Sequence, residues 1–195
     1  MPARRPAYVP GQVYHLYNQG AHGVSIFREQ ENYVFVLRKM QSYCQSLQLA
    51  PIAYCLLPNH YHYLIRQDGE LAAGLLPQRV YNSYSKAYNK RYGHRGTLFA
   101  GNYRVKAVEP EGYLLHLCRY IHANPVIHGL VDSVVDWPYS NYPEWIGERA
   151  GILVDRDFVG ARFSAPDDYR AFVAEYLAER RLPEELASYL REWED

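Results

Sequence analysis

The chain has 195 residues, of which 48% are hydrophobic and 22% are charged, a composition typical of one folded domain with an appendage. It contains no run of 18 apolar residues and no apolar segment near residue 1, so we expect a cytoplasmic protein with no membrane partner. Three cysteines stand singly in apolar stretches, which excludes the spacing of a zinc site and indicates buried free thiols.

The net charge of zero hides an uneven distribution. Residues 1–130 carry 14 basic and 6 acidic side chains, a net charge of +8, whereas residues 131–195 carry 7 basic and 15 acidic side chains, a net charge of −8. A basic segment suits a polyanion, and the 20 tyrosines offer rings for stacking on bases. We therefore predict a nucleic-acid-binding domain at 1–130 and an acidic extension at 131–195; the alternative is two ordinary surfaces that differ in charge by chance.

The first half of the chain alternates between strand and helix patterns. Residues 13–18 are rich in β-formers and predict a strand, and residues 31–49 have apolar side chains at helical spacing. Residues 52–57 form an apolar run that ends at a Pro-Asn turn, after which residues 61–67 predict a strand paired back onto it.

The pattern then continues toward an acidic C-terminal segment. Residues 78–92 predict a helix closed by Gly93, residues 98–108 look extended, and residues 111–123 predict a helix that ends before Asn124-Pro125. Two acidic helices are expected at 167–179 and 184–193. This order predicts an α+β fold of the split βαβ type, similar to ferredoxin or RRM domains, with a central antiparallel sheet, helices packed on one side and a C-terminal helical extension.

The segment His60-Tyr61-His62 is the first candidate for chemistry. Residues i and i+2 of a strand point to the same face, so both imidazoles can hold one divalent ion while Tyr61 points into the core. A lone pair of histidines at this spacing is also compatible with ordinary surface or core residues.

The second candidate is the pair Tyr120 and Asn124, which are one helical turn apart. A tyrosine hydroxyl near a metal-bound phosphate can attack phosphorus, and an amide oxygen is a suitable ligand for Mg²⁺ or Mn²⁺. The plain alternative is a packed tyrosine and a helix-capping asparagine.

Taken together, these segments resemble a known family. The matching pieces are Tyr14 to Asn18, Leu57 to His62, Gly96 to Phe99, Tyr120 to Gly129 and Asp136 to Ser140, which occur in the family's order over about residues 12–145. The sequence is similar to the HUH single-tyrosine transposases, specifically the REP-associated tyrosine transposases of bacteria. One departure is Gly101-Asn102-Tyr103-Arg104, where the family often has an Arg-Tyr pair.

The resemblance implies a function and roles for particular residues. It implies a transposase that cuts and rejoins single-stranded DNA flanked by REP-like hairpins, through a 5′-phosphotyrosine intermediate and with Mg²⁺ or Mn²⁺. Tyr120 matches the nucleophile, His60 and His62 match the metal-binding pair, and Asn124 matches the third ligand. The partner would be hairpin DNA, with no small-molecule cofactor, and the protein would be a monomer or homodimer.

Other residues are candidates for DNA contact or support. His116 lies one turn before Tyr120 and is the best candidate for a supporting role. The cations expected to contact phosphates are Lys86, Lys90, Arg91, Arg95, Arg104 and Lys106.

Two other functions remain open on the residues alone. One is an RRM-like module that binds single-stranded nucleic acid without cutting it. The other is a metal-dependent hydrolase of small phosphoesters, which the scarcity of carboxylates near the two histidines disfavours.

Overall fold

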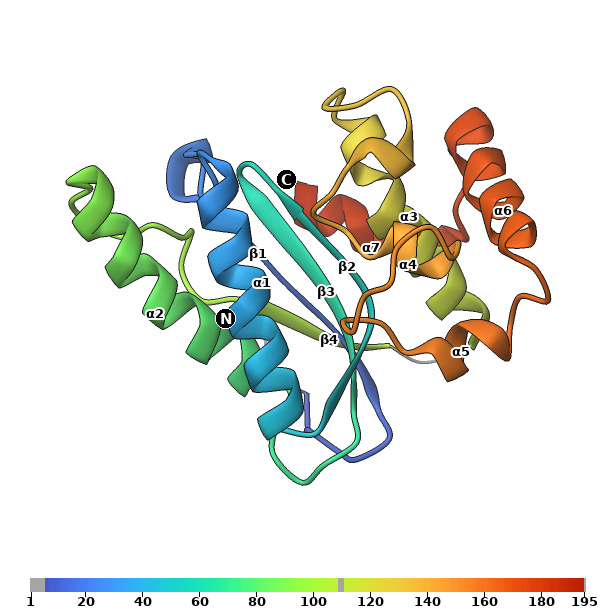
Figure 1. The fold of residues 1–195 in the computed structure, drawn as a ribbon, viewed down its shortest axis with the longest axis horizontal. Helices are drawn as coiled ribbons and strands as arrows, with labels where there is room; N and C mark the ends of the chain where they lie inside the picture. The colour runs from blue at the N-terminus through green and yellow to red at the C-terminus, as the bar shows by residue number, and fades with distance from the viewer. Residues whose placement is uncertain (1–5, 109–110, 195) are drawn as a thin grey trace.

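A four-stranded antiparallel sheet with strand order β2-β3-β1-β4 forms the centre of the computed structural model, which describes residues 6–108 and 111–194 (Figure 1). The strands are β1 (Val13–Gln19), β2 (Leu49–Leu57), β3 (His60–Gln67) and β4 (Arg104–Val108). β3 is an inner strand, joined to β2 by the predicted Pro-Asn turn and paired with β1 on its other side. β4 pairs with β1 and forms one edge.

Two long helices cover one face of this sheet. Helix α1 (Gln30–Ser46) and helix α2 (Leu75–Tyr92) pack on side chains that include Leu16, Leu56 and Tyr63. Gly93 ends α2 with a positive φ of 61°, a conformation that glycine adopts without a steric cost. A short 3-10 turn, η1 (Ala21–Gly23), connects β1 to α1 in the sequence.

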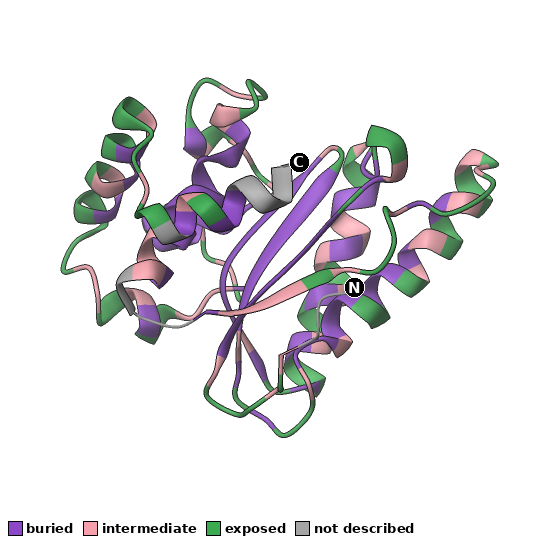
Figure 2. Cartoon of the chain, turned by 180° about the vertical axis from the view of Figure 1, so that it is seen from behind, coloured by how far each residue is buried: buried purple, intermediate pink, exposed green. Residues whose placement is uncertain are grey.

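The opposite face is covered by helix α3 (Glu111–Ile127) and the C-terminal segment. That segment contains η2 (Val134–Asp136), α4 (Tyr142–Trp145), α5 (Arg156–Gly160), α6 (Pro166–Glu179) and α7 (Glu184–Glu194). Figure 2 shows the inner strands buried between the two helical layers and most of β4 intermediate in exposure.

The predicted α+β class and antiparallel sheet are confirmed, but the expectation that the helices lie on one side is not. Helix α3 packs on the face opposite α1 and α2, with Leu117 and Ile121 in the same core as Cys55 of β2. The reason lies in residues 52–57, which are apolar at every position. Both faces of that strand therefore need a cover.

The predicted end of α3 at residue 123 is also wrong. The helix continues through Pro125 to Ile127, and Gly129 follows with a φ of 66°. Proline removes only one backbone donor, and the hydrogen bond from His128 N to Asn124 O (2.9 Å) continues the turn beyond it. The prediction that residues 98–108 are extended is confirmed only for β4, because residues 98–103 form a loop.

The acidic extension shares a core with α3. His122 of α3 bonds the Tyr169 hydroxyl (2.6 Å) and Asn141 Oδ1 (2.9 Å), and Trp145 is buried beside them. The free thiols Cys44, Cys55 and Cys118 are buried, as predicted. Within residues 6–108 and 111–194, no helix has the length and apolarity that a membrane span requires.

Candidate active site

The strand β3 separates two kinds of side chain by simple alternation. His60 and His62 lie on the α3 face with ring centroids 5.3 Å apart, and Tyr61 lies on the other face, stacked on Tyr81 at 4.1 Å. This confirms the predicted geometry of the strand. Both histidines are buried on this face, since His60 is 5% exposed and His62 is 0% exposed. The α3 side chain Tyr120 lies against His62, and α7 adds Tyr189 to the same covered face.

Both histidines are held through Nδ1. The Nδ1 of His60 lies 2.8 Å from Asn59 Oδ1, an oxygen that can only accept, so His60 carries its proton on Nδ1. The Nδ1 of His62 lies 2.9 Å from His15 Nε2. In this arrangement Nε2 is the nitrogen of each ring that can coordinate a metal, and both Nε2 atoms are shielded from solvent.

Helix α3 brings the proposed nucleophile and third ligand to these rings. The Tyr120 ring lies edge-on to His62 with centroids 5.8 Å apart, and Tyr120 is 4% exposed. Asn124, one turn later, donates from Nδ2 to Tyr120 O at 2.7 Å, and its amide also interacts with the His60 ring. Because α3 continues past Pro125, His128 reaches within 5.0 Å of the His60 ring centroid.

Burial keeps these imidazoles neutral. Desolvation lowers the pKa of His60 to about 4, assisted by His128 and opposed by the Asn124 amide. The pKa of His62 is lowered well below its ordinary value, first by burial and then by the neighbouring histidines. At neutral pH both rings therefore offer a lone pair, which is the form that binds metals.

The donor set fits a divalent ion if an amide takes part. Within the described residues, no group of three or more His, Cys, Asp or Glu side chains is arranged to hold a metal. Two neutral imidazoles and the Asn124 amide oxygen, which is also shielded from solvent, make a mixed set of nitrogen and oxygen donors that fits a divalent ion. Such a set leaves coordination positions for a substrate phosphate.

The sequence that builds this site matches a known protein family. The profile of the family described as "Transposase IS200 like" matches residues 11–124, more than half of the chain and all four strands of the sheet. The chain belongs to the IS200-like transposase family. This family match includes both histidines, Tyr120 and Asn124.

Two similar proteins extend the comparison. A Haemophilus influenzae protein named as a REP-associated tyrosine transposase is 29% identical over 118 residues, which cover 51% of this chain and 62% of the relative's length. A solved structure of a REP-associated tyrosine transposase bound to a REP hairpin superposes with a TM-score of 0.60 at 19% identity, covering 80% of this chain and 94% of that one. The second match shows a shared fold.

The structure adds residues to the candidate site that the sequence interpretation missed. His15 of β1 shares the face of His62 and links it to the Tyr189 hydroxyl of α7, which lies 2.7 Å from His15 Nδ1. The spacing of His15 and Tyr17 on one strand is the same i, i+2 signal that identified the histidine pair. No local signal marks Tyr189, which is 174 residues away in the sequence.

The predicted supporting and DNA-contacting residues fall in three places. His116 packs against Phe172 of α6 and not in the cluster of His60 and His62. Arg104 and Lys106 pair in register with Tyr17 and His15, which puts them on the site's face of β4. The remaining cations of the set belong to α2 or the loop after it: Lys86, Lys90, Arg91 and Arg95.

The contacts of Arg91 and Lys106 bear on how each could meet DNA. Arg91 Nε lies 2.7 Å from Glu29 Oε1 in an exposed ion pair, a contact of small energetic value that DNA phosphates can replace. Lys106 Nζ lies 3.8 Å from the Tyr189 ring centroid, so α7 occupies the place where this cation would meet a phosphate.

Proposed function

We propose that this protein is a metal-dependent, single-strand DNA endonuclease and strand transferase that cuts and rejoins DNA flanked by REP-like hairpins. The observation that carries the proposal is the convergence of four side chains from two elements: Tyr120 and Asn124 of α3 meet His60 and His62 of β3. The family match and the names of the relatives support the substrate class. Its proposed place of action is the bacterial cytoplasm, where DNA is found.

The proposed metal ligands are Nε2 of His60, Nε2 of His62 and the amide oxygen of Asn124. A divalent ion bound there supplies Lewis-acid polarisation of the scissile phosphate. Asn59 and His15 orient the two rings through their Nδ1 atoms. The bond from Asn124 to the Tyr120 carbonyl ties the third ligand to the turn that carries the nucleophile.

In the proposed reaction the Tyr120 hydroxyl oxygen attacks phosphorus, and the bond from phosphorus to the 3′-oxygen breaks. The tyrosine keeps the 5′-phosphate, its phenolic proton is released, and the departing 3′-oxygen takes up a proton. Joining is the reverse step, in which a 3′-hydroxyl attacks the phosphotyrosine. Burial of Tyr120 and the neutral histidines around it limits the access of water, which would otherwise hydrolyse the link.

The test is formation of a covalent adduct between the protein and labelled hairpin DNA with single-stranded flanks, in Mn²⁺ or Mg²⁺. We expect a band that survives denaturation and disappears with chelator. Tyr120→Phe keeps the ring in its place beside His62, so DNA binding should persist while the adduct is lost. An unchanged adduct with Tyr120→Phe would refute the nucleophile, and binding without any metal-dependent adduct would favour the RRM-like binding module.

A further inference from the structure

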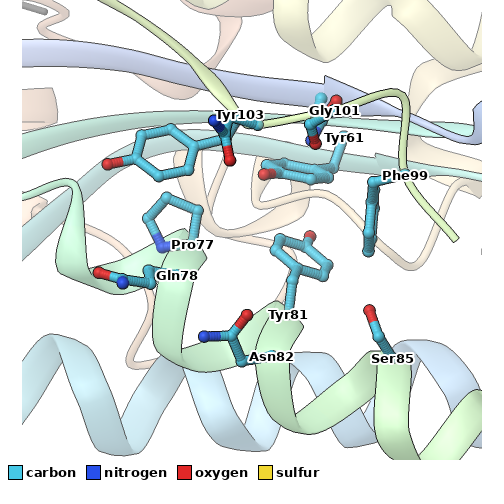
Figure 3. Close-up of a pocket in the computed structure, with 11 residues that line it drawn as sticks. Tyr61, Pro77, Gln78, Tyr81, Asn82, Ser85, Phe99, Gly101 and Tyr103 are labelled. Atoms are coloured by element: carbon cyan, nitrogen blue, oxygen red, sulfur yellow. The ribbon is translucent and has the colours of Figure 1, made fainter. Parts of the chain in front are cut away.

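On the face of the sheet opposite the histidines, a cavity of about 200 Å³ opens between α2 and the loop at residues 99–103 (Figure 3). Its volume is below the roughly 300–1,000 Å³ of pockets for drug-sized ligands, which suits one small planar group. Asn18 of β1 and Tyr61 of β3, which are paired in register, form its floor. The cavity therefore lies directly behind the candidate active site.

The chemistry of the lining is uniform. Every lining side chain is either aromatic, aliphatic or an uncharged polar group. In Figure 3, Gln78, Asn82 and Ser85 rise from α2 on one side, and Phe99 and Tyr103 come from the loop on the other. A lining without charge does not suit a phosphate or a metal ion, whereas amides beside rings suit a flat, neutral group with donors and acceptors on its edge.

Several contacts hold the walls in place without a ligand. The Asn18 amide donates to Gly101 O at 3.3 Å, and Ala100 N donates to Gln19 O at 2.9 Å, so the loop is fixed to the end of β1. Tyr103 reaches the start of α2 only because Gly74 has no side chain, since a Cβ there would lie 2.3 Å from the Tyr103 hydroxyl oxygen. The cavity is thus preformed.

We propose that this cavity binds one unpaired nucleobase of the DNA substrate, with Gln78 and Asn82 reading its edge and Phe99 or Tyr103 stacking on its face. This inference rests on the proposed function and specifies which part of the DNA contributes specificity. Asn and Gln amides match base edges, and exposed bases stack on aromatic rings in single-strand recognition. Lys86, the exposed residue after Ser85 on α2, is the proposed contact for a neighbouring phosphate.

The position of the cavity sets where the recognised base lies. A strand that enters both the cavity and the active site crosses from one face of the sheet to the other, and Arg104, which follows Tyr103 and lies on the site's face of β4, provides a cation beside such a path. The recognised base is therefore separated from the scissile phosphate and belongs to the unpaired DNA beside the hairpin or to an unpaired base within it.

The test uses a set of labelled hairpin oligonucleotides in which each unpaired nucleotide is replaced in turn by an abasic site, with affinity measured by fluorescence anisotropy. For the wild type, we expect one position at which loss of the base weakens binding about tenfold or more, the size expected of a stacked base. In Asn82→Ala and Gln78→Ala that sensitivity should shrink. Both side chains are exposed on a helix, where alanine is well tolerated. Gln45→Ala is the matched control and should keep the wild-type profile, because Gln45 is an exposed amide of α1 that does not line the cavity.

A wild-type profile without a sensitive position, or one that Asn82→Ala and Gln78→Ala leave unchanged, would overturn the base pocket. The adduct assay on the wild type separates this from failure of the proposed function. If DNA binds but no adduct forms, the nuclease proposal fails while the abasic profile still decides whether the cavity holds a base.

Discussion

The two faces of the sheet receive alternate residues of the same strand, β3, and become different environments. On the α3 face, His60 and His62 meet further polar groups, and burial lowers the pKa of both rings. On the α1/α2 face, Tyr61 and Tyr63 enter a cluster of stacked tyrosines whose pKa values burial raises. Neighbouring residues thus divide the proposed chemistry of phosphoryl transfer from the packing that supports it, and a change on one face should leave the packing of the other intact.

The strongest test of that division compares substitutions at two adjacent residues of β3, one on each face of the sheet. His62→Gln removes a proposed ligand, and we expect adduct formation to fall by at least about 100-fold. Tyr63→Phe removes the 2.6 Å hydrogen bond to the Tyr81 hydroxyl, which should lower the free energy of unfolding by about 1 kcal/mol and leave adduct formation near the wild-type level. Adduct assays and urea unfolding of both variants check this. Equal loss of activity in the two would show that the faces are not independent.

The next largest effect is expected at His15, whose ring contacts His62. His15→Gln removes the ring that holds His62 Nδ1 at 2.9 Å, and we expect affinity for Mn²⁺ to fall about 10- to 100-fold with little change in DNA binding. Calorimetric titration with Mn²⁺ measures this. Tyr14→Phe is the matched control, because Tyr14 adjoins His15 on β1 but packs in the opposite core. If His15→Gln kept the wild-type affinity for Mn²⁺, His15 would have no role in the metal site.

Much of this arrangement follows from the sequence, but not all of it. The strand alternation of His60, Tyr61 and His62 and the one-turn spacing of Tyr120 and Asn124 are local rules, and the structure brings these residues together. The contact of His15 with Tyr189 joins distant segments through a helix that has no motif, so local patterns could not find it. The division at residue 130 stays a prediction.

Acid should destabilise the folded chain through the buried histidines of the α3 face. The pKa is about 3 for His15 and about 4 for His60 and His122, in each case first because of burial, whereas unfolded histidines titrate near 6.5. The unfolded chain therefore binds protons first as pH falls. The stabilisation is complete above about pH 6.5 and is lost toward pH 4, with a slope of up to about 1.4 kcal/mol per pH unit for each histidine.

Urea unfolding at pH 7, 6 and 5 in the presence of chelator measures this slope. The tyrosines of the α1/α2 face with raised pKa values stay protonated throughout this range and contribute nothing to it. A free energy of unfolding that is constant between pH 7 and pH 5 would contradict the buried, neutral state of the histidines.

The smallest expected effect concerns the acidic extension. A net charge of −8 over residues 131–195 predicts that this segment binds DNA weakly on its own and can cover the basic face. In the structure, α7 is the part of the extension that covers a cation of the basic face, because the Tyr189 ring lies on Lys106. Cutting the chain near residue 147, before α6, would instead remove the buried Tyr169 and expose Trp145, which packs against it, so truncation after Leu182 is the cleaner experiment. This truncation makes Lys106 available to one additional phosphate. We therefore expect several-fold tighter binding of random single strands and a salt dependence steeper by about 0.7 in log-log slope.

The same truncation combined with Lys106→Gln should lose that gain in affinity, because the added phosphate contact is gone. If the truncated protein keeps the full-length affinity and slope, α7 serves only to complete the core beside Tyr17 and has no part in selecting DNA.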